Sequence, residues 1–217
     1  MTDMGFKTPF NCMIAGSSGS GKTTLLYKIL RYQDEIFETP PEKIYLFYSE
    51  PQEIYNNMEY EGVVDKLIMG TPTSEKLKQL VSPYKKKGGT VCIFDDALKD
   101  ITDDMEYIFT TLTHHLNMSV FFLTQSLFFQ NKSYRTMTLN AHYLFVMKSP
   151  RDSSQISHLA KQVSPYKTKF VIDSYQNATR RPYTYLLIDL HQRTPDYLRY
   201  LSNIVPSEWP MEIYVRI

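Results

Sequence analysis

The sequence predicts an α/β fold in which a mainly parallel sheet is sandwiched by helices. Short apolar segments typical of buried strands alternate with segments whose apolar residues repeat at helical spacing. A glycine-rich loop at residues 16–23 lies between the first such strand and the first such helix. Strands joined by helices form parallel pairs, and the helices cover the faces of the resulting sheet.

The strands and helices can be placed from these patterns. The expected strands are residues 10–15, 43–48, 65–69, 90–96, 119–124, 142–148 and 183–189. The expected helices are residues 25–30, 74–81, 102–116 with Thr102 as its N-cap, and 152–160 with Asp152 opening a capping box. A long polar and aromatic loop is expected before residue 142, and an irregular segment after residue 189. We expect a single domain over residues 1–201 and a C-terminal tail, 202–217, that packs on this domain or on a neighbouring subunit.

Composition excludes several classes of protein. The chain of 217 residues fits one domain, and its 42% hydrophobic and 22% charged residues are typical of a folded protein. A net charge of +1 argues against a uniformly basic DNA-coating protein. No apolar run reaches transmembrane length and the N-terminus lacks a secretory pattern, so we expect an intracellular protein without a membrane partner. Cys12 and Cys92 lie in apolar strands and are expected to be reduced packing residues.

The glycine-rich loop predicts a nucleotide site. It reads Gly16-Ser17-Ser18-Gly19-Ser20-Gly21-Lys22-Thr23 and matches every fixed position of the phosphate-binding pattern G-x-x-x-x-G-K-[ST], the Walker A motif of P-loop NTPases. Backbone N–H groups of such a loop wrap a phosphate at the start of a helix. We expect Lys22 to reach the β and γ phosphates, Thr23 to offer its hydroxyl to Mg²⁺, and Thr24 to complete the nucleotide-binding set.

Polar residues that end two further strands complete a hydrolytic site. The strand before Asp95 and Asp96 delivers two carboxylates to the edge of the sheet that also carries the loop. We expect Asp95 to hold Mg²⁺ and Asp96 to act as the general base or to orient the attacking water. Gln125, at the end of another strand, can touch both the γ phosphate and this water. Lys22, Asp96 and Gln125 are therefore candidate catalytic residues.

The nucleotide and the reaction class follow less directly. The Asn-Lys-x-Asp pattern that reads guanine is absent, because the similar Asn131-Lys132-Ser133-Tyr134 has no acid, so ATP is the expected nucleotide. Two alternatives to an enzyme that hydrolyses ATP stay open. One is a phosphotransferase that shares the loop and uses an arginine-bearing lid. The other is an assembly factor that binds ATP but hardly turns it over.

A longer stretch carries a resemblance to a known family. The segments 115–128, 135–143 and 148–152, with weaker similarity at 178–189 and 202–206, resemble the genome-packaging ATPases of Polinton/Maverick elements and adintoviruses. These are relatives of the poxvirus-type virion packaging ATPases within the FtsK/HerA superfamily. The resemblance implies an additional strand between the Walker A strand and the strand of the acidic pair, called Walker B. This chain departs from the superfamily in having Asp-Asp where many members have Asp-Glu.

The resemblance also implies a function and its partners. It implies a homo-oligomeric ring that drives double-stranded DNA into a preformed capsid without reading its sequence, at the assembling virion in the host nucleus or cytoplasm. An arginine of one subunit then reaches the γ phosphate bound by its neighbour. Arg135 is the first candidate for this catalytic role and Arg151 the second. The alternatives are a solvated or phosphate-contacting loop residue for Arg135 and a structural ion pair, which is favoured, for Arg151. Candidates for DNA contact are Lys85-Lys86-Lys87, residues 129–135 and Arg180-Arg181, although a lysine triplet is also typical of a solvated turn.

Overall fold

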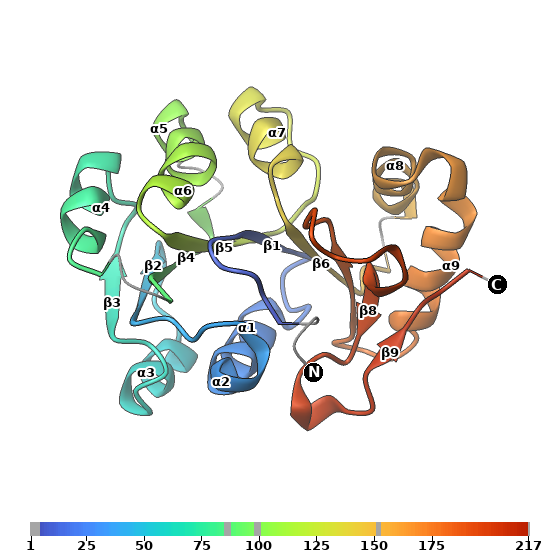
Figure 1. Ribbon diagram of the computed structural model, residues 1–217, viewed down its shortest axis with the longest axis horizontal. Coiled ribbons are helices and arrows are strands. Elements are labelled where there is room, and N and C mark those ends of the chain that lie inside the picture. The colour runs from blue at the N-terminus through green and yellow to red at the C-terminus, as the bar shows by residue number, and fades with distance from the viewer. Residues whose placement is uncertain (1–4, 85–87, 98–100, 151–152, 217) are drawn as a thin grey trace.

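The computed structural model of the chain describes residues 5–84, 88–97, 101–150 and 153–216. Within these residues nine strands form one sheet (Figure 1). In chain order they are β1 (Asn11–Ala15), β2 (Lys43–Tyr48), β3 (Lys66–Met69), β4 (Thr90–Asp95), β5 (Met118–Thr124), β6 (Tyr143–Met147), β7 (Tyr185–Asp189), β8 (Tyr200–Ser202) and β9 (Glu212–Ile213).

The order of the strands is β3-β2-β4-β5-β1-β6-β7-β8-β9. The strands from β3 through β6 pair in parallel, and β7, β8 and β9 extend the sheet with antiparallel pairs. Strand β5 pairs with β1 on one side and with β4 on the other. One strand therefore separates the strand that enters the glycine-rich loop from the strand that ends in Asp95. The predicted fold class, including the additional strand, is confirmed.

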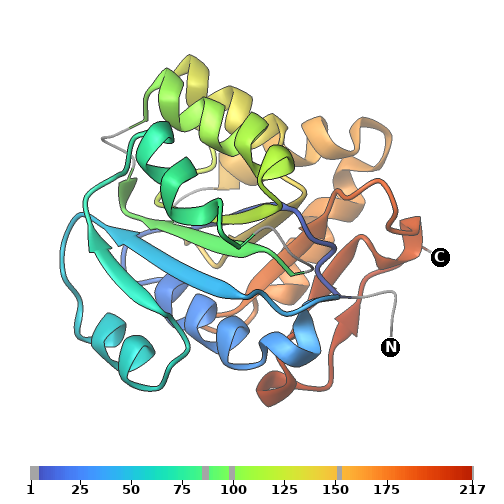
Figure 2. The same ribbon diagram turned by 60° about the vertical axis from the view of Figure 1, so that its left-hand side comes forward.

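Helices cover both faces of the sheet (Figures 1 and 2). One face carries α1 (Lys22–Arg31), α2 (Gln33–Ile36) and α3 (Glu53–Tyr60). The other carries α4 (Ser74–Val81), α5 (Asp103–Tyr107), the π-helical turn η2 (Ile108–Leu112), α6 (Thr113–His115), α7 (Lys132–Leu139), α8 (Ser153–Val163) and α9 (Thr168–Ala178). The described residues also include the 3₁₀ turns η3 (Pro165–Lys167), η4 (Asp196–Leu198) and η5 (Pro206–Glu208). Among the helices of these ranges, none is both long and apolar enough to cross a membrane.

The central strands are buried on both faces, which explains their continuous apolar sequences. On β1, Met13 joins the apolar layer beneath α4 to α9, while Cys12 and Ile14 join the layer beneath α1 to α3. Cys92 on β4 faces the opposite layer from Cys12. Burial raises the pKa of both thiols, so both stay protonated at neutral pH. The two cysteines are packing residues, as predicted.

Two expectations about irregular segments are wrong. The loop expected before residue 142 contains α7, which begins because the Asn131 side chain accepts a hydrogen bond from the backbone N–H of Tyr134 at 2.9 Å. Tyr134 and Met137 form its buried face. The segment after β7 contains β8 and β9, which are too short to show an alternating pattern. Helices α3 and α9 were also not predicted from the sequence. The lysine triplet 85–87, Arg151 and the capping residue at 152 lie outside the described residues.

Candidate functional site

The glycine-rich loop connects the end of β1 to the start of α1. The N–H of Gly16 donates to the carbonyl of Thr124 at 3.1 Å, which ties the start of the loop to the end of β5. Gly19 and Gly21 have φ angles of 74° and 93°, in the left-handed region that favours glycine. A Cβ on Gly16 would lie 2.6 Å from the Cβ of Met147, so no other residue fits there unless the end of β6 moves. The loop conformation therefore depends on its glycines.

Hydrogen-bond donors of this loop are placed for an anion. The buried hydroxyl of Ser20 has no partner among the described residues. The ammonium group of Lys22 lies across the loop and donates to the carbonyls of Gly16 at 2.8 Å and Ser17 at 3.1 Å. Burial lowers the pKa of Lys22, and the carboxylates of Asp95 and Asp96 oppose this shift. The Lys22 ammonium, the loop amides and the N-terminus of α1 fit the charge and size of a phosphate.

Asp95 ends β4 below the loop and is only 4% exposed. Its Oδ2 accepts hydrogen bonds from the Thr23 hydroxyl and from the Tyr55 hydroxyl, each at 2.9 Å. Burial raises the pKa of Asp95, whereas these two hydrogen bonds and the charge of Lys22 favour the carboxylate. A hydroxyl and a carboxylate oxygen held side by side are ligands that Mg²⁺ prefers. The two residues predicted as metal ligands are therefore adjacent.

Asp96 and Gln125 also meet at this edge. Asp96 follows β4 with a φ of 57° and an exposed side chain. The Gln125 side-chain amide donates to Asp96 Oδ1 at 3.3 Å, and the Ser49 hydroxyl donates to the Asp96 carbonyl at 3.3 Å. Strands β4 and β5 are parallel neighbours, so their carboxyl ends bring the two side chains together. The arrangement can orient a water molecule between a carboxylate and an amide.

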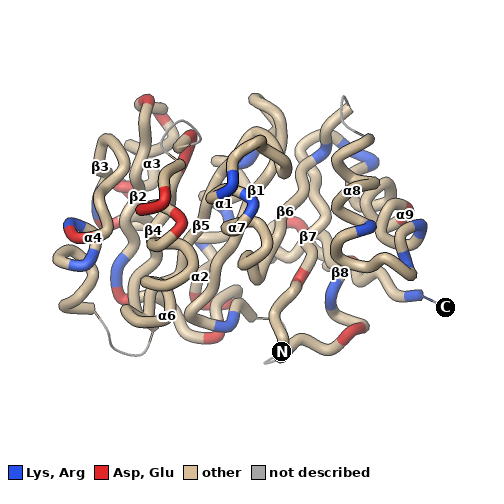
Figure 3. Tube along the Cα trace, turned by 90° about the horizontal axis from the view of Figure 1, so that it is seen from above, with Lys and Arg blue, Asp and Glu red and all other residues tan. Residues whose placement is uncertain are grey.

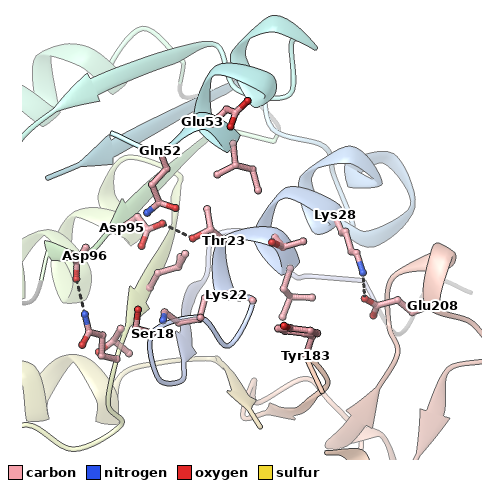
Figure 4. Close-up of a pocket in the computed structure, with 18 residues that line it drawn as sticks. Ser18, Lys22, Thr23, Lys28, Gln52, Glu53, Asp95, Asp96, Tyr183 and Glu208 are labelled. Atoms are coloured by element: carbon pink, nitrogen blue, oxygen red, sulfur yellow. Dashed lines mark hydrogen bonds and ion pairs between the residues drawn. The ribbon is translucent and has the colours of Figure 1, made fainter. Parts of the chain in front are cut away.

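A cavity of about 710 Å³ opens beside the loop (Figure 4). Among the predicted residues, the loop members Ser18, Gly19, Gly21, Lys22, Thr23 and Thr24 line it together with Asp95, Asp96 and Gln125. Gly16, Ser17 and Ser20 belong to the loop but do not line this cavity. Arg135 lies on the exposed side of α7 and does not line it either. The structure thus brings the loop, the two acids and Gln125 together and leaves Arg135 apart.

Several lining residues were missed from the sequence. Gln52, the N-cap of α3, lines the cavity, and it donates to the hydroxyl of Tyr55, which does not itself line the cavity but holds Asp95. The spacing of Tyr55 and Met58, both buried, is the available signal for α3. Lys28 lies one turn beyond Thr24 on α1, so the helical pattern of that segment was sufficient to place it. Tyr183 and Glu208 enter from the C-terminal part of the chain. No local pattern marks these two, because only the antiparallel extension of the sheet carries them to the cavity.

Charge is unevenly distributed around this edge of the sheet. Acidic residues gather around β2, β4 and α3, whereas basic residues occur beside α1 and along α8 and α9 (Figure 3). Lys161, Lys167 and Lys169 are the exposed lysines at the corner between α8 and α9. Lys22 of the loop therefore faces Asp95, which ends β4, and Asp96, which follows it.

Solved structures of low sequence identity share this fold. The genome packaging NTPase B204 from Sulfolobus turreted icosahedral virus 2, in complex with AMP, matches with a TM-score of 0.56 at 16% identity over 87% of this chain and 96% of that one. Its complex with ATP-gammaS matches with a TM-score of 0.54 at 15% identity over 96% and 98% of the two chains. The cytoplasmic domain of the Type VII secretion ATPase EccC from Thermomonospora curvata gives a TM-score of 0.51 at 14% identity, over 82% of this chain and 24% of that one.

These likenesses show the P-loop NTPase fold. No curated protein sequence matches the chain. A family profile does match, and it covers most of the sequence, from before β1 to within α9. Because the family described as Poxvirus A32 protein matches residues 3–173, the chain belongs to that family.

Proposed function

We propose that this protein is an ATPase that drives double-stranded DNA into a viral capsid. The observation that carries the proposal is the meeting of the phosphate loop, the Thr23–Asp95 pair and the Asp96–Gln125 pair at one cavity. Membership of the Poxvirus A32 protein family supports the packaging role, as does the fold shared with the genome packaging NTPase B204. The narrower likeness to Polinton and adintovirus ATPases stays a prediction.

The side chains divide the work of hydrolysis. The loop amides and the Lys22 ammonium bind the triphosphate of ATP, and Thr23 with Asp95 would hold Mg²⁺. Held by these two residues, Mg²⁺ would supply positive charge that offsets the negative charge of the phosphates. Asp96 accepts a proton from the attacking water, and Gln125 orients that water through its contact with Asp96. Lys22 leaves its own loop carbonyls to meet the phosphates.

The proposal extends to Gln125, which reports the state of the nucleotide to α7. The residue before it, Thr124, has its hydroxyl 3.1 Å from the Tyr134 hydroxyl, and Tyr134 also donates to the carbonyl of Ser126. A movement of Gln125 when the γ phosphate leaves therefore pulls on the first turns of α7. Arg135 follows Tyr134 on that helix and faces outward. This supports a homo-oligomeric ring in which Arg135 completes the site of the neighbouring subunit.

Contacts with DNA and with the capsid complete the proposal. Arg180 and Arg181 are both exposed after α9, and Phe129 is 50% exposed before α7. We assign the basic side chains to the DNA phosphates, which they grip without reading sequence. Capsid proteins are the second partner, and the site of action is the assembling virion in the host nucleus or cytoplasm.

Two measurements test this function. ATP turnover is expected to rise when long duplex DNA is added, without transfer of phosphate to any metabolite. In a ring with shared sites, mixing Lys22→Ala subunits into wild-type protein lowers turnover more steeply than the fraction of variant. A linear decline argues against shared sites. If the protein transfers phosphate to a small molecule and DNA does not stimulate its ATP hydrolysis, it is a phosphotransferase and the proposed function is wrong. The oligomeric state, measured on the same samples, shows whether a loss of turnover comes from subunits that do not assemble or from a catalytic site that does not work.

A further inference from the structure

The cavity has an end that the hydrolytic residues do not occupy. Figure 4 shows Asp95 and Asp96 on one side of Thr23, and Lys28, Glu208 and Tyr183 on the other. In the proposed site the loop holds the phosphates with the γ phosphate toward the acids, which leaves this second end for the remainder of the nucleotide. Helix α1 advances about 1.5 Å per residue, which places Lys28 one turn, about 6 Å, beyond Thr24.

Tyr183 supplies an aromatic surface there. The residue is 68% exposed, and of the four most exposed tyrosines among the described residues, which are Tyr60, Tyr166, Tyr183 and Tyr197, it alone lines the cavity. The ring lies against the loop, because a Cβ on Gly21 would be 3.3 Å from its Cδ1. Its backbone has a φ of 62°, a conformation that costs free energy for a bulky residue. An exposed ring held in a costly conformation beside a ligand cavity points to a binding role.

The same end has a fixed rim. The Lys28 ammonium and a carboxylate oxygen of Glu208 form an ion pair at 3.0 Å, and the other oxygen accepts from the Tyr185 hydroxyl at 2.9 Å. Tyr185 in turn accepts from the N–H of Ile204 at 3.0 Å, and Val205 is fully buried. The segment that carries Glu208 is therefore anchored to β7 and to the core. It closes the cavity with a cation and an anion side by side.

We infer that Tyr183 is a stacking platform for the nucleobase, at the end of the cavity bounded by the Lys28–Glu208 pair. The ligand is a planar aromatic heterocycle with hydrogen-bonding groups on its edge, attached to the triphosphate that the loop holds. This inference rests on the proposed ATPase function. It adds a base-binding residue that lies outside the phosphate loop and outside the family match, which ends at residue 173.

Calorimetric titrations with two ligands, ATP and inorganic tripolyphosphate, both with Mg²⁺, separate base binding from phosphate binding. Tyr183→Ala is expected to weaken ATP binding by about tenfold, the effect of one lost stacking contact, and to leave tripolyphosphate binding unchanged. Tyr183→Phe keeps the ring and is expected to bind ATP like wild type. Tyr166→Ala is the matched control, because it removes a tyrosine of η3 that is 97% exposed and does not line the cavity.

The variant Tyr183→Gly tests the backbone argument. Glycine adopts the left-handed conformation freely, so its melting temperature is expected to equal or exceed that of wild type while ATP binding falls as for alanine. Equal ATP affinity for wild type, Tyr183→Ala and Tyr183→Gly overturns the inference while the ATPase proposal stands. Wild-type protein that binds neither ATP nor tripolyphosphate overturns the proposed function itself. A parallel loss of both ligands in Tyr183→Ala, with an unchanged melting temperature, assigns Tyr183 to the loop and also overturns the stacking role.

Discussion

Replacing Tyr55 by phenylalanine removes one hydroxyl from a buried position without changing the size of the ring. That hydroxyl donates to Asp95 Oδ2 at 2.9 Å and accepts from the Gln52 side-chain amide at 2.8 Å. Gln52 is exposed and can turn to water, so the main loss is a hydrogen bond to a carboxylate. Such bonds contribute about 1.5–3 kcal/mol. Asp95 keeps its bond from Thr23 and borders a cavity open to water, so we expect a loss of about 1.5 kcal/mol, at the lower end of that range.

The functional effect should appear in the metal dependence of turnover. Mutating a residue that orients a metal ligand typically lowers metal affinity by 10- to 100-fold. Tyr55 is one of two donors to Asp95, so we expect an effect at the lower end of this range. The Mg²⁺ concentration for half-maximal ATP turnover should therefore rise about tenfold. Urea unfolding measures the stability loss on the same protein. Tyr48→Phe is the control, because its ring lies 5.3 Å from that of Tyr55. Identical Mg²⁺ curves for Tyr55→Phe and Tyr48→Phe would refute the reasoning.

Three further predictions concern other residues. Asp96→Asn should lower the rate of ATP hydrolysis by about 10²- to 10⁴-fold, because the amide cannot accept the proton, while ATP binding persists; a rate near wild type moves the base elsewhere. Arg135→Ala should lower turnover by about 10³-fold or more with an unchanged dissociation constant for ATP, since Arg135 lies outside its own cavity; turnover within about twofold of wild type excludes it as the trans-acting arginine. Burial, with the nearby His142, lowers the pKa of His191 from 6.5 to about 4, and its Nδ1 already accepts a backbone N–H. The His191 imidazole thus stays neutral in the folded state at pH values where it binds a proton in the unfolded state, so the free energy of unfolding should fall as pH drops from 6.5 toward 4. In urea titrations His191→Asn should weaken this pH dependence. His115→Asn, at an exposed position, should leave it unchanged.

The sequence was sufficient to predict the site residues that belong to short, continuous sequence patterns. The glycine-rich loop occupies eight consecutive positions. Asp95 ends one strand and Gln125 directly follows another, and both strands have continuous apolar sequences. Parallel pairing then requires these ends to meet at one edge. The wider site depends on segments far apart in the chain. Glu208 meets Lys28 across 180 positions.

Local conformation explains the remaining differences. Tyr183 was included in a strand, but its left-handed backbone and the start of β7 at Tyr185 place it in a turn where its ring reaches the cavity. The segment after Gln125 has the composition of a loop, yet the Asn131 cap and a single buried face are sufficient for α7. A role for Arg135 in a neighbouring site depends on a second subunit, which a single chain cannot specify.

Movement along DNA is the central claim, and displacement of a third strand measures it most directly. A triplex-forming oligonucleotide is bound to one end of a long duplex, and its release is followed after the protein and ATP are added. The account predicts release that requires ATP hydrolysis, grows slower as the duplex between the loading region and the triplex is lengthened, and is absent with Lys22→Ala. DNA-stimulated ATP turnover without any release of the third strand would contradict it.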